Sequence, residues 1–87
     1  MITIHLIYGT TGEYSCERTW LVCGYESKDL ALQHMHHAQQ FADQVFASEE
    51  FYNLQGDENP FDPKMQMQYT GTKYHYVSVS LREELPK

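Results

Sequence analysis

Hydrophobic and polar residues alternate in three short segments of the chain, and this alternation is typical of half-buried β-strands. The three segments are residues 2–8 (ITIHLIY), 18–25 (RTWLVCGY) and 73–83 (KYHYVSVSLRE). The glycine, threonine and serine content of residues 9–15 (GTTGEYS) is typical of a turn. We therefore expect residues 2–25 to form a β-hairpin with a long polar connection.

Between residues 28 and 47 the hydrophobic residues recur every three or four positions, which predicts an amphipathic helix. The apolar stripe of this helix consists of Ala31, Met35, Ala38, Ala42 and Val45. Ser27 precedes the segment in the N-cap position, and Asp29 in the first turn favours the helix dipole. Neither glycine nor proline interrupts the segment.

Residues 48–72 are expected to form a long irregular loop, because Asn59-Pro60 and Asp62-Pro63 disfavour helical geometry. The aromatic and methionine residues of this loop predict that it packs partly against the body. The 87 residues then form a single α+β domain, 1–87, with the element order β-β-α-β. A right-handed crossover through the helix gives a three-stranded antiparallel sheet of order 2-1-3.

A single helix covers only one face of such a sheet. In the third strand, Tyr74 and Tyr76 alternate with aliphatic residues and lie on one side. We expect this tyrosine side to be the uncovered one, together with His5 and Ile7 of the first strand. An open face of this kind favours homodimerisation or the binding of a partner protein.

Aromatic side chains supply the candidate contact surface. Tyr14 and Tyr69 lie beside strand ends, and the 2-1-3 order places them at the same end of the sheet. Tyrosine and tryptophan are common in interfaces because they combine a large apolar area with a polar group. The candidate partner-binding aromatic residues are Tyr14, Trp20, Tyr69, Tyr74 and Tyr76. The alternative is that these rings merely cap a thin sheet.

Six basic and twelve acidic residues give the chain a formal net charge of −6. Residues 43–62 contain no Lys or Arg, and the candidate acidic contacts are Glu49, Glu50, Asp57, Glu58 and Asp62. Direct binding to the phosphates of nucleic acid requires the opposite sign of charge. A basic partner, such as a nucleic-acid-binding protein, is therefore the expected target of this segment, unless the segment serves only solubility.

Histidines are concentrated in the helical segment, where His34 and His37 lie three residues apart and are weak candidates for metal ligands. Neither an HExxH motif nor zinc-finger spacing is present, so histidines at the seam or in solvent are the simpler interpretation. The adjacent glutamates at 49–50 and 83–84 project in different directions, which argues against a pair of acid–base catalysts. No nucleophile–base arrangement is recognisable in the sequence. We therefore expect neither an enzyme nor a cofactor.

No apolar run approaches 18 residues, which argues against a transmembrane helix. The sequence MITIHLIYG lacks a basic leader and a cleavage site, so we expect no signal peptide. In a protein without a signal peptide, Cys16 and Cys23 are expected to be reduced thiols in a cytoplasm.

The chain resembles a group of small accessory proteins of bacteriophages and prophages with a β-β-α-β outline. The segments that carry this resemblance are residues 7–15 (IYGTTGEYS), 20–25, 59–63 (NPFDP) and 69–81. Cys16 departs from the pattern, because an acidic residue is expected after GEYS. The resemblance implies a protein that acts in the bacterial cytoplasm, and it supplies no catalytic residues.

Taken together, these features favour a non-enzymatic phage protein that binds and inhibits a bacterial host or immune-system protein, in the manner of an anti-CRISPR. Two alternatives stay open. The first alternative is a module that binds a small ligand or a metal, and the second is a homo-oligomeric structural component of a phage.

Overall fold

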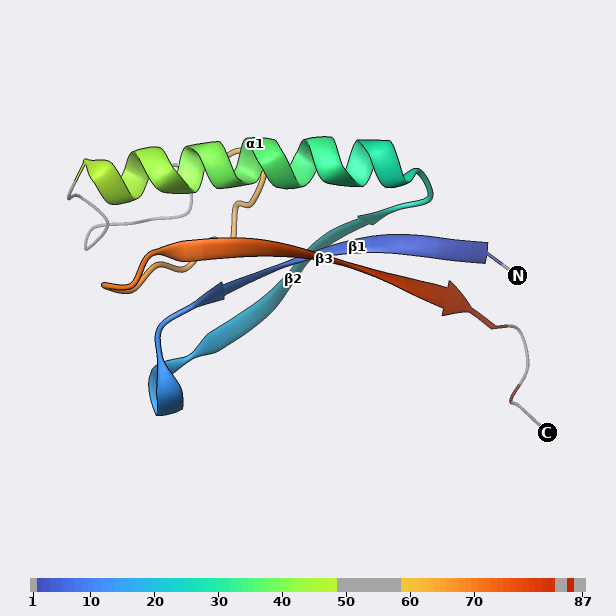
Figure 1. The fold of residues 1–87 in the computed structure, drawn as a ribbon, viewed down its shortest axis with the longest axis horizontal. Helices are drawn as coiled ribbons and strands as arrows, with labels where there is room; N and C mark the ends of the chain where they lie inside the picture. Colours follow the sequence, from blue (N-terminus) through green and yellow to red (C-terminus); the bar gives the residue numbers. More distant parts are fainter. Residues whose placement is uncertain (1, 49–58, 83–84, 86–87) are drawn as a thin grey trace.

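The computed structural model describes residues 2–48, 59–82 and 85. The order of its elements is β1 (Ile2–Thr11), the short 3-10 helix η1 (Tyr14–Cys16), β2 (Arg18–Tyr25), α1 (Lys28–Ala47) and β3 (Thr72–Leu81). The strands form one antiparallel sheet of order β2-β1-β3, and α1 lies along one face of it (Figure 1). The predicted α+β fold and the 2-1-3 strand order are confirmed.

Helix α1 begins where the sequence predicts, because the Ser27 hydroxyl accepts a hydrogen bond from the backbone N–H of Leu30. The buried residues of α1 are Ala31, Ala38 and Ala42. Their small side chains allow the helix to approach the sheet closely. Among the described residues, no helix combines the length and the hydrophobicity that a membrane span requires.

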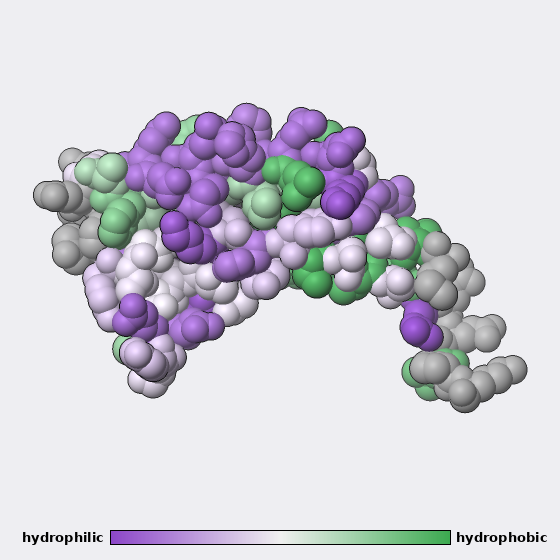
Figure 2. Space-filling model, viewed as in Figure 1, coloured by the Kyte–Doolittle hydropathy of each residue, from purple (hydrophilic) through white to green (hydrophobic). Residues whose placement is uncertain are grey.

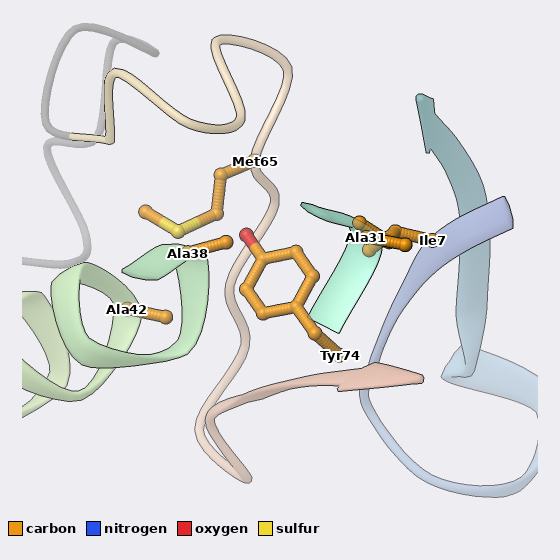
Figure 3. Packing of buried hydrophobic residues seen from close by; sticks show 6 residues of the cluster. All are labelled: Ile7, Ala31, Ala38, Ala42, Met65 and Tyr74. Atoms are coloured by element: carbon orange, nitrogen blue, oxygen red, sulfur yellow. The ribbon is translucent and has the colours of Figure 1, made fainter. Parts of the chain in front are cut away.

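The core lies between α1, the sheet and the loop that precedes β3. Its buried hydrophobic residues are Ile7, Ala31, Ala38, Ala42, Met65 and Tyr74. Met65 belongs to the loop, and Figure 3 shows its side chain and the Tyr74 ring lying beside Ala38. The prediction that the loop packs partly against the body is confirmed for the described part of it.

Strand β2 contains a β-bulge. The register of β1 against β2 shifts between Ile7 and Tyr8, which makes Val22 the extra residue. Strict alternation would direct Trp20 away from the helix. The bulge instead brings the indole to the helix side, where it lies over Gly9.

The face of the sheet that α1 covers is opposite to the predicted one. Ile7 is fully buried and Tyr74 is 7% exposed, and both belong to the core beneath α1. On the same side, the Tyr76 hydroxyl lies 2.7 Å from Nδ1 of His5, and Tyr76 is half-buried. The prediction of an open tyrosine face was therefore wrong. A phenol with a hydrogen-bond partner is readily buried, and here this outweighs the preference of tyrosine for half-exposed positions.

The side chain of Gln39 in α1 completes the outer edge of β3. Its Oε1 accepts a hydrogen bond from the backbone N–H of Tyr74, and its Nε2 donates one to the carbonyl of Thr72, each at 2.9 Å. The amide thus takes the place of a neighbouring strand. It protects this part of the edge from pairing with another chain.

The substitution Gly9→Ala is expected to destabilise the fold, because its Cβ would lie 2.6 Å from Cζ2 of Trp20. The indole of Trp20 cannot move aside easily, because it donates a hydrogen bond to Asp62. The overpacking should therefore lower the free energy of unfolding in urea by about 1–3 kcal/mol. The matched control is Gly24→Ala, whose Cβ would meet the flexible end of Leu6 (Cδ2, 2.8 Å) and a methyl group of Ile4 (Cγ2, 3.0 Å). This control is expected to cost less than about 1 kcal/mol, and equal costs would contradict the placement of the indole.

Candidate functional site

The sequence NPFDP forms two consecutive turns. The backbone N–H of Asp62 donates to the carbonyl of Asn59, and that of Met65 donates to the carbonyl of Asp62, each at 3.0 Å. Pro60 and Pro63 occupy the second position of each turn, which their fixed φ favours. The two turns direct the side chains of Asn59 and Asp62 into the interior, where both are buried.

The carboxylate of Asp62 is the centre of a buried hydrogen-bond network. Its Oδ2 accepts hydrogen bonds from Nε1 of Trp20 at 2.8 Å and from the Tyr74 hydroxyl at 2.7 Å. The side-chain amide of Asn59 donates to the carbonyl of Ala38 at 2.9 Å and lies 3.3 Å from the Tyr74 hydroxyl. These bonds join the loop to β2, β3 and α1. In the described part of the chain, every buried side-chain nitrogen and oxygen has a partner.

Two groups close to the Asp62 carboxylate have raised pKa values. Burial raises the pKa of the Tyr74 phenol well above its usual range, and the bond to Asp62 adds to this effect. Burial also raises the pKa of the Cys23 thiol, with a further contribution from the Asp62 charge. Tyr74 is therefore a permanent donor to the carboxylate. Cys23 is a neutral thiol and lacks the thiolate character of a reactive cysteine.

Several predicted contact residues serve this interior instead of a partner. Asp62 and Tyr74 are buried, and their prediction as partner contacts is corrected, because their polar atoms bind each other. Trp20 and Tyr76 are half-buried, and their polar atoms bind Asp62 and His5. The acidic candidates that lie outside the described residues are Glu49, Glu50, Asp57 and Glu58.

The hairpin between β1 and β2 presents an exposed tyrosine. Tyr14 is 93% exposed and has a φ of 53°, in the left-handed region that side chains other than glycine rarely adopt. Two backbone hydrogen bonds hold this turn. The N–H of Cys16 donates to the carbonyl of Glu13, and the N–H of Glu17 donates to the carbonyl of Tyr14.

Further hydrogen bonds fasten this turn to the segment before β3. Nε2 of Gln68 donates to the carbonyl of Cys16 at 2.8 Å, and the Tyr69 hydroxyl donates to the Glu13 carboxylate at 3.3 Å. The Thr11 hydroxyl accepts a bond from the backbone N–H of Gln68 at 2.9 Å. The prediction that the turn around residue 14 and Tyr69 lie at the same end of the sheet is confirmed.

We call this end of the molecule the tip surface, formed by Glu13, Tyr14, Gln68 and Tyr69. Tyr69 is 66% exposed, so two tyrosine rings stand in solvent here. Beside them lies a hollow of about 400 Å³ lined by Ser15, Cys16, Glu17, Arg18 and Gln68. Two exposed aromatic rings on a hydrogen-bonded support suit the recognition of another macromolecule.

A second surface occupies the side of the sheet that faces away from α1. We call it the aliphatic face, formed by Ile2, Ile4, Leu6, Leu21, Val77, Val79 and Leu81. The pairing of β1 with β3 places Ile4 beside Val79 and Leu6 beside Val77. Figure 2 shows apolar surface on this side of the molecule, below the helix and toward the C-terminal end. The alternation in the first and third strands placed their aliphatic residues on the side opposite to Tyr74 and Tyr76, but it did not identify that side as the exposed one.

The histidines of α1 hold the loop in place. A backbone carbonyl only accepts, so Nε2 of His34 donates to the carbonyl of Phe61 at 2.7 Å, while Nδ1 lies 2.8 Å from the Tyr25 hydroxyl. The ring of His37 stacks on Phe61 with a centroid distance of 4.9 Å. Within residues 2–48, 59–82 and 85, no three His, Cys, Asp or Glu side chains converge as a metal site requires. The structure thus gives His34 and His37 packing roles.

Comparison of the chain with protein-family models, with curated proteins and with solved structures gave no match. The tip surface and the aliphatic face are therefore the basis for assigning a function.

The substitution Tyr74→Phe is expected to lower the free energy of unfolding by about 1–2 kcal/mol, because the buried Asp62 carboxylate loses a donor. Urea unfolding at neutral pH measures this loss. The matched control is Tyr76→Phe, whose hydroxyl contacts His5 at a half-buried position, and it should cost less than about 1 kcal/mol.

The same variant has a distinctive pH dependence. Because the pKa of Tyr74 is raised in the folded protein, its contribution is fully present below about pH 10, the pKa of an unfolded tyrosine. It declines at higher pH, since the unfolded chain ionises while the folded phenol stays protonated. Tyr74→Phe should therefore lose less stability than the wild type between about pH 9 and pH 11. Parallel losses in the two proteins would be incompatible with a buried Tyr74.

Proposed function

We propose that the protein acts by binding another protein, without catalysing a reaction, and that the tip surface is the contact region. The observation that carries this proposal is the conformation of Tyr14, an exposed aromatic residue at φ 53°. The left-handed conformation costs about 1–2 kcal/mol, and residues kept in such conformations cluster at binding sites. The hydrogen bonds around the turn order the surface before binding, which lowers the entropic cost of association.

The proposed target is a protein of a bacterial host, and the specific case is a component of an immune system such as CRISPR. Support comes from the resemblance to phage accessory proteins and from the net charge of −6. This charge would steer the protein toward a basic, nucleic-acid-binding partner. In this proposal the protein inhibits its target in the bacterial cytoplasm.

The substitution Tyr14→Asn separates binding from stability. Asparagine tolerates the left-handed region, so the free energy of unfolding should stay unchanged or rise by up to about 1 kcal/mol. The loss of an exposed aromatic contact should weaken partner binding about tenfold or more. The measurements are affinity capture of host proteins from a bacterial lysate, and plaquing of a CRISPR-targeted phage on cells that express each variant.

The control is Leu30→Asn, which also replaces an exposed apolar side chain but lies in α1. It should capture the same host protein as the wild type and protect the phage equally. The proposal fails if Tyr14→Asn retains full capture and protection. It also fails if the wild type captures no host protein and protects no phage.

A further inference from the structure

The aliphatic face is a continuous apolar surface in the described structure. Five of its seven residues have exposed fractions between 38% and 62%. The strand pairing of Ile2 with Leu81, Ile4 with Val79 and Leu6 with Val77 joins the residues of β1 and β3 into one strip, and Leu21 of β2 lies opposite Tyr8, the next residue of β1 on this side. Contiguous exposed apolar surface of this kind marks a site of contact with another macromolecule.

The core on the other side of the sheet is small. Of its six buried hydrophobic residues, three are alanines. The radius of gyration is 14.6 Å, against about 12 Å expected for a compact chain of 87 residues. A single copy is thus an open arrangement of one helix on one sheet. A further layer on the free face would complete it.

The charge distribution favours a second copy of the chain as that layer. The net charge is −6, so two copies repel each other where their acidic surfaces meet. The described strand residues directed to this face include no carboxylate, and Lys73 lies beyond the strip, near the start of β3. A basic partner would be attracted to the acidic parts of the molecule, whereas an uncharged aliphatic strip is complementary to itself.

The available area is sufficient for a dimer of modest affinity. Strands about 4.8 Å apart that rise about 3.3 Å per residue give the whole outer side of the three-stranded sheet, of which the aliphatic face is one part, a projected area of roughly 400 Å². The accessible area of the protruding side chains is larger than their projection. Contact between two such sheet sides over their full length therefore buries about 1,000 Å² in total, the lower end of the range for specific interfaces.

We propose that two copies of the chain pack their aliphatic faces together across a two-fold axis that passes near Ile4 and Val79. The two sheets form a sandwich with α1 of each copy on the outside. The tip surfaces are not part of this interface. The dimer thus presents two tip surfaces, which allows bivalent binding.

The test is sedimentation equilibrium of the full chain between about 1 µM and 1 mM. A monomer–dimer equilibrium is expected, and it should persist or strengthen between about 0.1 and 1 M NaCl, because apolar contact is not screened by salt. Val79→Lys should weaken the dimer at least about tenfold, since a charge then enters the apolar interface. The control is Leu30→Lys in α1, which should leave the dimer unchanged.

A second measurement guards against unfolding of the Val79→Lys variant. In a Cys16→Ser background, Val79→Cys should form a cross-linked dimer with a short bis-maleimide, and Leu30→Cys should not. A wild type that stays monomeric at every concentration overturns the proposal. So does equal weakening by Val79→Lys and Leu30→Lys, or a Val79→Cys variant that does not cross-link.

Discussion

The hydrogen bonds to the buried Asp62 carboxylate determine which face of the sheet meets the helix. A carboxylate at 1% exposure is tolerated only where donors replace water. Here the donors are Trp20 and Tyr74, which belong to the two outer strands. Both side chains must therefore point toward the loop and α1. Because side chains alternate along a strand, the aliphatic residues of β3 then point away from the helix.

The β-bulge at Val22 is a condition for this arrangement. Without the extra residue, Trp20 would lie on the outer face and the carboxylate would lose one of its two donors. The same constraint separates the two candidate surfaces. The tip surface is held by the turns at one end of the sheet. The aliphatic face is exposed because the single helix α1 covers only the other face of the sheet. The proposed binding of a partner and the proposed self-association can therefore be altered independently.

Local patterns predicted α1 and the three strands but not the orientation of the sheet. They also missed that β1 extends to Thr11, into the segment expected to be a turn, and that Tyr14–Cys16 form the 3-10 helix η1. Helix α1 and the strands could be predicted from the N-cap at Ser27, the alanine stripe and the alternation in the strands, because these signals depend on neighbouring residues. The strand order followed from the right-handed crossover through the helix. The covered face depends on contacts between Asp62 and two distant strands, and one shifted register in β2 reverses a side chain. The asparagine and aspartate of NPFDP indicated turns. Their side chains are buried because they contact Trp20 and Tyr74, which are distant in the sequence, and a local pattern cannot reveal such contacts.

The most direct test of the orientation of the sheet is nuclear Overhauser spectroscopy on the isotope-labelled full chain. We expect cross-peaks from the Tyr74 ring protons to the methyl groups of Ala38 and Met65, which lie together in the core (Figure 3). Cross-peaks from the methyl groups of Val77 or Val79 to that of Ala38 would instead place the aliphatic face beneath the helix. That result would contradict the central role of Asp62.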